Sequence, residues 1–176
     1  MTDSMPLFSQ LPDDSTVWIH VSSRPLTDSE AEQLQTTVTQ FTSQWTSHER
    51  PVLSDWKLID KQILVLAAFV SNGDLSGCGI DKHQHILANF ANTNTFEWAG
   101  PLSVTFRGLD QRLRTVSRSA FATIVKSDML PDSTIVVDQS ISNLSAARTG
   151  IEVPASSSWH GRHFPFTESV SNAVLD

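Results

Sequence analysis

The segment DLSGCGIDK holds the residue types best suited to covalent chemistry in this chain. Its cysteine, Cys78, is the only one in the sequence, and it lies between Gly77 and Gly79 just before an expected helix. Amide N–H groups and the helix dipole at such a position lower the pKa of a thiol, and the glycines let the backbone wrap around an anion. With His48 or another histidine as general base, the segment fits a cysteine nucleophile beside an oxyanion cradle.

A structural interpretation of this segment is favoured over the chemical one. The glycines then form a tight turn, Asp81 caps the next helix, and Cys78 is a small buried side chain. Other thiol and nucleotide chemistries lack their partners: C-x-x-C has no second cysteine, and C-x5-R has Gln84 in place of arginine. The residues LSGCG resemble the signature of ABC transporter ATPases, but no G-x-x-x-x-G-K-[ST] is present, so the chain is not a P-loop ATPase.

Two groups of candidate site residues follow from these patterns. The catalytic candidates are Cys78, His48, Asp81 and His160. The ligand or anion candidates are Ser76, Gly77, Gly79, Arg112 and Arg114. Arg112 and Arg114 are expected on one face of a strand, as a solvated face or as a patch for an acidic partner. The histidines lack H-E-x-x-H spacing, and we expect neither a metal nor a cofactor.

The charge and composition of the chain argue against two classes of partner, nucleic acids and membranes. The 176 residues carry a net charge of −7, which argues against general binding to nucleic acid or to anionic membranes. No apolar run approaches the ~20 residues of a membrane span, and the first residues do not resemble a signal peptide. With one cysteine and no export signal, a cytoplasmic location is expected.

Periodicity indicates which elements must position these residues in the first half of the chain. We expect a strand at 17–21, followed by a helix that Thr27 and Glu30 cap. The apolar stripe of this helix runs to Trp45, and Pro51 is expected to end the helix. The segment 54–70 reads as two strands with a turn near Asp60, the second of them central in the sheet. A loop with the glycines leads to a helix that Asp81 caps.

The second half reads as a smaller α+β piece. A hairpin is expected from LSVTF and RLRTVSR, then a short helix capped by Ser119 and a strand in STIVVD, while the remaining residues read as loop. The fold class is therefore α+β, with a βαββα half around a mixed or antiparallel sheet and a ββαβ piece. The expected divisions are a flexible N-terminus at 1–16, a core at 17–98, a subdomain packed on that core at 99–166, and a disordered tail at 167–176.

The runs FTSQWTSHERP, SGCGIDK and SWHGRHF resemble, in order and spacing, an uncharacterised family of small bacterial proteins often labelled "ABC transporter ATPase". The resemblance spans roughly residues 17 to 164 and implies a shared fold unit without an assigned activity. It points to eight residues: Trp45, His48, Ser76, Gly77, Cys78, Asp81, Trp159 and His160. The chain departs from the family pattern at Gly79 and His83, where hydroxyl side chains are expected.

Because no catalytic motif is complete, the sequence favours a soluble, non-enzymatic binding or interaction protein. Its partner would be a small ligand or another protein. The alternative is a cysteine-dependent enzyme or thiol redox sensor that uses Cys78. The sequence does not name the ligand or the oligomeric state.

Overall fold

The computed structural model describes residues 6–71, 73, 75–127 and 130–166. The chain divides into two compact units, each described here by itself. Unit 1 comprises residues 1–99 and 139–151, and unit 2 comprises residues 100–138 and 152–176. The expected disordered tail at 167–176 lies outside the described residues.

Unit 1 is built on a three-stranded antiparallel sheet in the order β1-β5-β4. Its elements are β1 (Thr16–Val21), α1 (Asp28–Ser43), β2 (Thr46–Ser47), β3 (Arg50–Pro51), β4 (Leu53–Ile59), β5 (Ile63–Phe69), α2 (Gly77–Asn94) and α4 (Leu144–Thr149). Strand β5 pairs on both edges and is buried on both faces, as its unbroken apolar sequence predicts.

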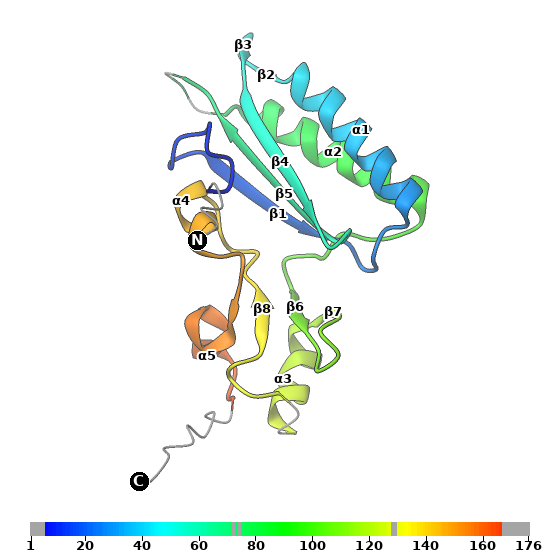
Figure 1. Ribbon diagram of the computed structural model, residues 1–176, viewed down its shortest axis with the longest axis vertical. Helices are drawn as coiled ribbons and strands as arrows, with labels where there is room; N and C mark the ends of the chain where they lie inside the picture. Colours follow the sequence, from blue (N-terminus) through cyan, green and yellow to red (C-terminus); the bar gives the residue numbers. More distant parts are fainter. Residues whose placement is uncertain (1–5, 72, 74, 128–129, 167–176) are drawn as a thin grey trace, which may run out of the picture. The chain divides into compact units, whose positions relative to one another are not determined.

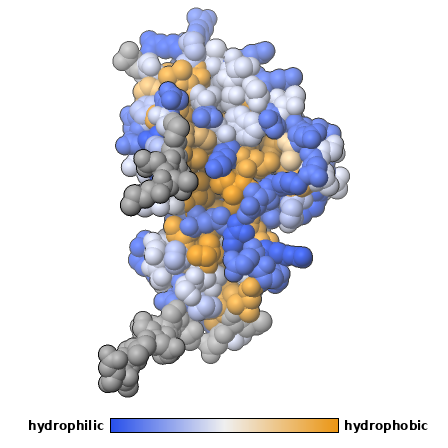
Figure 2. All heavy atoms as spheres, viewed as in Figure 1, coloured by the Kyte–Doolittle hydropathy of each residue, from blue (hydrophilic) through white to orange (hydrophobic). Residues whose placement is uncertain are grey.

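Helices α1 and α2 lie side by side on one face of this sheet (Figure 1). The core between the sheet and the helices joins Leu64 and Leu66 of β5 to Leu34 of α1 and Leu87 of α2. On the face that Figure 2 views, hydrophobic residues gather over the strands of unit 1, with hydrophilic residues around them.

Local signals in the sequence account for how these elements begin and turn. Thr27 and Glu30 form the expected capping box at the start of α1. Asp60 and Lys61 turn β4 into β5 with φ values of 50° and 52°, and Gln62 N donates to Ile59 O at 3.0 Å.

The expected end of the first helix is wrong. Helix α1 ends at Ser43, before Trp45, and does not run to Pro51. The chain instead forms a small hairpin of β2 and β3, whose turn residues His48 and Glu49 both have positive φ. A tight turn of this kind breaks the helical spacing on which the prediction rested.

The opposite face of the sheet is covered by segments that the sequence assigned to a flexible start and to loop. Phe8 and Leu11 are buried, so the flexible description of 1–16 does not hold from residue 6 onward. Helix α4 adjoins β1, where Leu144 N donates to Ser15 O at 2.9 Å. The segment 139–151 therefore belongs to unit 1, not to a subdomain at 99–166.

Unit 2 holds a four-stranded antiparallel sheet in the order β7-β6-β8-β9. Its elements are β6 (Ser103–Arg107), β7 (Leu113–Ser117), α3 (Arg118–Lys126), β8 (Ile135–Val137), β9 (Glu152–Pro154), the 3-10 turn η1 (Ala155–Ser157) and α5 (Trp159–His163). The expected ββαβ order is present, but Ser117 caps α3 in place of Ser119. Strand β9 and helix α5 replace the expected loop.

The two units together give the α+β class that the sequence predicted. The core of unit 2 is separate from that of unit 1 and centres on Phe121, Val104 and Val136.

Candidate functional site

Cys78 lies in the first turn of α2, and the structural interpretation of its segment is wrong in two respects. Helix α2 begins at Gly77, and its N-cap is Ser76, five positions before the expected cap Asp81. The Ser76 side chain accepts a hydrogen bond from Gly79 N at 3.1 Å, so Gly77 and Gly79 are helical and form no separate turn or cradle. Cys78 is exposed and not buried.

The exposed thiol gives a direct prediction for labelling. Iodoacetamide is expected to alkylate Cys78 in the folded protein, because no unfolding is needed to reach the sulfur atom. Mass spectrometry of the native and urea-unfolded chain between about pH 6 and about pH 9, a range that includes the pKa of a free thiol, measures the two labelling rates. A Cys78→Ser variant serves as the blank. Labelling that requires urea would contradict the exposure and end the thiol-sensor alternative.

The other catalytic candidates do not form a constellation with Cys78. His48 is exposed in the turn of the β2–β3 hairpin, and Asp81 is exposed within α2, where it caps nothing. His160 belongs to unit 2 and is buried, with its Nδ1 atom 2.9 Å from Ser158 Oγ. Burial lowers the pKa of His160 to about 4, so its imidazole is neutral near pH 7.

The hairpin does bring His48 near the start of α2. Ser76 N donates to Ser47 Oγ at 2.9 Å, and both serines line a hollow of about 440 Å³. Arg50 and His48 line the same hollow, but Cys78 does not. The hollow is thus a surface feature of the hairpin, separate from the thiol.

The expected pair of arginines does not share a strand face. Arg112 lies in the turn before β7, whereas Arg114 is within β7 and forms an ion pair with Asp110 at 3.1 Å. Arg107 is likewise paired, with Glu152 at 2.5 Å. These ion pairs neutralise part of the basic cluster that the sequence suggested.

Two hollows of unit 1 lie along α1 and α2 and share part of their lining, so that they form one groove. One hollow of about 710 Å³ spans the start of α1 and the end of α2, and another of about 500 Å³ spans the end of α1 and the start of α2. They share Thr37 and Ile86. We call this continuous surface the α1–α2 groove; its walls are made by the following residues: Ser29, Glu32, Gln33, Thr36, Thr37, Gln40, Phe41, Gln44, Trp45, Thr46, Lys82, Ile86, Asn89, Phe90, Thr93 and Asn94.

The walls of the groove are mostly uncharged hydroxyl and amide side chains. The hydroxyls of Thr36, Thr37 and Thr93 donate to carbonyls of their own helices at 2.8 to 3.0 Å. Because each hydroxyl already donates its proton to a carbonyl, its oxygen atom remains able to accept a hydrogen bond from an N–H group of a ligand. The amides of Gln40 and Asn89 supply both donors and acceptors.

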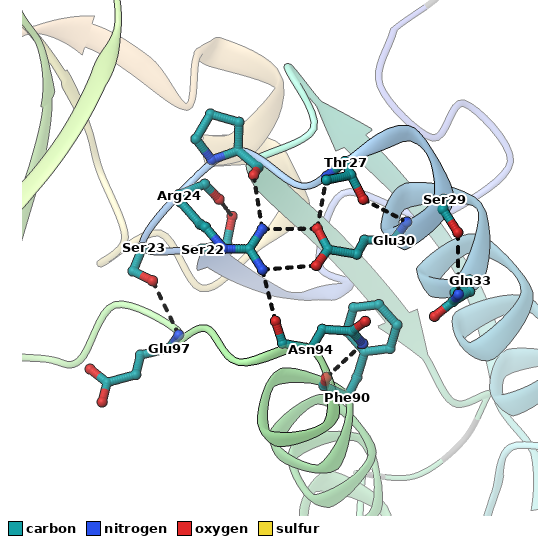
Figure 3. Close-up of polar contacts among 11 residues, drawn as sticks. Ser22, Ser23, Arg24, Thr27, Ser29, Glu30, Gln33, Phe90, Asn94 and Glu97 are labelled. Atoms are coloured by element: carbon teal, nitrogen blue, oxygen red, sulfur yellow. Dashed lines mark hydrogen bonds and ion pairs between the residues drawn. The ribbon is translucent and has the colours of Figure 1, made fainter.

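Arg24 fixes one end of the groove by joining the start of α1 to the end of α2 (Figure 3). Its guanidinium donates two hydrogen bonds to Glu30, each of 2.8 Å, and one to Asn94 O at 2.7 Å. Glu30 also accepts from Thr27 N at 2.8 Å. The Arg24 guanidinium, with help from Thr27, lowers the pKa of the Glu30 carboxyl to about 2, so this junction is charged throughout the physiological range.

Trp45 connects the other end of the groove to the interior. Its indole Nε1 donates to Gly79 O at 3.1 Å, and its ring lies 5.8 Å from that of His83. A Cβ atom on Gly79 would approach Trp45 Nε1 to 3.5 Å and Ser76 Oγ to 3.3 Å. The glycine in the first turn of α2 therefore allows close packing under Trp45.

Neither a metal centre nor a membrane-spanning helix is found in the described parts of the chain. No three histidine, cysteine, aspartate or glutamate side chains there are grouped so that they could hold a metal ion. No described helix combines the length and apolar character needed to cross a membrane. In comparisons with family models, curated proteins and solved structures, the chain shows no significant match.

Proposed function

We propose that this chain is a non-enzymatic binding protein that holds an extended peptide segment of a partner protein in the α1–α2 groove. The observation that carries the proposal is the continuity of the two hollows through Thr37 and Ile86. None of the residues that line the groove is a cysteine or a histidine, which favours binding over catalysis. We place this activity in the cytoplasm, which the single unpaired cysteine supports.

The chemistry of the walls favours a peptide main chain as the ligand. An extended peptide presents N–H and C=O groups in alternation. The hydroxyl oxygen atoms of Thr36, Thr37 and Thr93 match the N–H groups, and the amides of Gln40 and Asn89 match either kind. Ile86 and Phe90 offer an apolar floor for one side chain of the peptide.

The charges of the groove indicate an orientation for the peptide. Glu32 lies in the hollow at the start of α1, and Lys82 lies in the hollow at the end of α1. The wall from Lys82 to Asn94 rises about 18 Å, which an extended segment of about six residues would span. We expect a largely uncharged segment with a basic residue near Glu32 and an acidic residue near Lys82.

Selection from a displayed library of random peptides tests this proposal. Peptides enriched on the full chain are expected to show the uncharged centre and the opposite charges at the ends. Ile86→Lys places a charge on the floor of the groove and is expected to weaken the enriched peptides at least about tenfold. His85→Lys adds the same charge at the neighbouring, exposed position of α2 and is expected to leave binding unchanged.

The two variants separate loss of the groove from loss of the fold. The circular dichroism spectrum of each variant should match that of the wild type. The free energies of unfolding in urea should agree within about 1 kcal/mol, because Ile86 is only half-buried. Peptides that bind the wild type and the Ile86→Lys variant equally would show that the groove is not the binding site.

A further inference from the structure

Two histidines meet inside unit 1, between β1 and α2. The ring of His20 lies 5.7 Å from the ring of His83 in an edge-on arrangement. Tryptophans surround the pair: Trp18 lies 4.5 Å from His83, and Trp98 lies 5.8 Å from His20. The side chain of His83 is 1% exposed, so this contact is part of the packing that joins α2 to the sheet.

Among the described residues, three of the four ring nitrogens of this pair are buried without a hydrogen-bond partner. They are Nε2 of His20 and both ring nitrogens of His83. A neutral imidazole in such a place loses hydrogen bonds with water, which costs a modest amount of free energy. An imidazolium would bury a charge with nothing to neutralise it, which costs much more.

Among the described residues, no carboxylate acts on the charge of either ring. Strand β1 presents Trp18, the segment after α2 presents Trp98, and the segment after α1 presents Trp45. Burial, and after it the nearby His20, disfavour the charged form of His83 more strongly than the electrostatic effect of the Ile80 carbonyl favours it. Within the described residues, the two imidazoles are ionisable groups in direct ring contact, and two positive charges there would repel each other.

We propose that the His20–His83 pair makes the contact between α2 and β1 sensitive to acid, so that α2 separates from the sheet as the pH falls below neutrality. The geometry that supports this is the packing of both rings against each other and against tryptophans where α2 meets β1. The proposal concerns the internal packing of unit 1 and does not depend on the peptide groove.

The direction of the pH dependence follows from proton binding. Burial lowers the pKa of each histidine from 6.5 to about 4. Between these values the form with α2 separated from the sheet binds protons, whereas the packed form does not. Stability from this contact is complete above pH 6.5 and is lost as the pH falls toward 4. Between pH 7 and pH 5 the opening equilibrium should rise up to about 20-fold for each histidine, and up to about 400-fold for both.

Hydrogen exchange of the full chain at pH 7 and pH 5 tests the proposal. After correction for the intrinsic exchange rate, α2 in the wild type should lose protection at pH 5 by at least about tenfold. In a variant with His20→Phe and His83→Phe this loss should disappear, because phenylalanine fills the space without titrating. His85→Gln, which removes an exposed histidine from the same helix, should behave as the wild type. A loss of protection that persists in the double variant would overturn the proposal.

A second measurement on the wild type needs no variant to fold. The carbon-13 shifts of the imidazole rings report the protonation of each histidine in the native state. His20 and His83 should remain neutral to about pH 5, because burial lowers the pKa of each to about 4. Titration of His20 and His83 near 6.5 in the folded chain would refute the proposal.

Discussion

Replacing Gly161 with alanine is expected to destabilise unit 2 by about 3 kcal/mol. Gly161 lies in α5, which packs closely against η1. A Cβ atom at this position would lie 2.6 Å from Ala155 O and 2.8 Å from the Cα atom of Ser156. Both atoms belong to the backbone, so no side-chain rotation relieves the overlap, and α5 has to shift away from η1.

Gly77→Ala provides the matched control, because it makes the same substitution near the start of another helix. No atom lies within 4 Å of a Cβ built on Gly77. Alanine there should stabilise α2 by about 0.5 kcal/mol, since glycine is the poorer helix former. Urea unfolding, followed by hydrogen exchange of each unit, measures both effects. A Gly161→Ala variant as stable as the wild type would show that the close approach of α5 to η1 is not required.

Replacing Arg148 with alanine should release residues 6–15 from unit 1 and cost about 3 kcal/mol. Arg148 of α4 donates to Leu7 O at 2.9 Å, to Phe8 O at 2.8 Å and to Leu11 O at 2.9 Å. It also forms an ion pair with Asp13. Without the guanidinium these carbonyls lose a charged donor, and the segment that buries Phe8 and Leu11 loses its attachment.

Two further variants define what Arg148 contributes. Arg148→Lys keeps the charge but presents a single ammonium in place of the planar fork, so it should restore less than about half of the lost stability. Arg112→Ala removes an exposed arginine from the turn before β7 and should change stability by less than about 0.5 kcal/mol. Exchange of residues 6–15 is the decisive readout: unchanged protection in Arg148→Ala would contradict the assignment.

Elements with strong local signals could be predicted from the sequence. The capping box of Thr27 and Glu30, the turn at Asp60 and the central position of β5 all follow from short-range chemistry. The β6–β7 hairpin was predicted in the same way, because two alternating segments flank a turn. These features need no knowledge of the rest of the chain.

Elements that depend on distant partners could not be predicted. The start of α2 carries two glycines, whose low helix propensity favours a loop, but Gly79 lets Trp45 pack and bond against that turn. Helix α4 and strand β9 are too short to show a period, and they form because β1 and β8 lie beside them. Tertiary contacts therefore override local preference at both places.

The structure does not bring together the catalytic candidates that the sequence suggested. Cys78, His48 and Asp81 are exposed at separate points, and His160 is part of the core of unit 2. His83 carried a signal that was missed: it lies four residues before Leu87, on the stripe that faces the sheet. Extending that stripe toward the start of the helix would have marked His83 as buried.

The division of the chain into units has a consequence for synthesis on the ribosome. Unit 1 is completed by residues 139–151, which follow the first segment of unit 2 along the chain. Residues 6–15 therefore emerge early but find Arg148 only after about 130 more residues have been made. Until then the face of the sheet that they cover lacks α4, and the nascent chain presents apolar strand surface that a chaperone could shield.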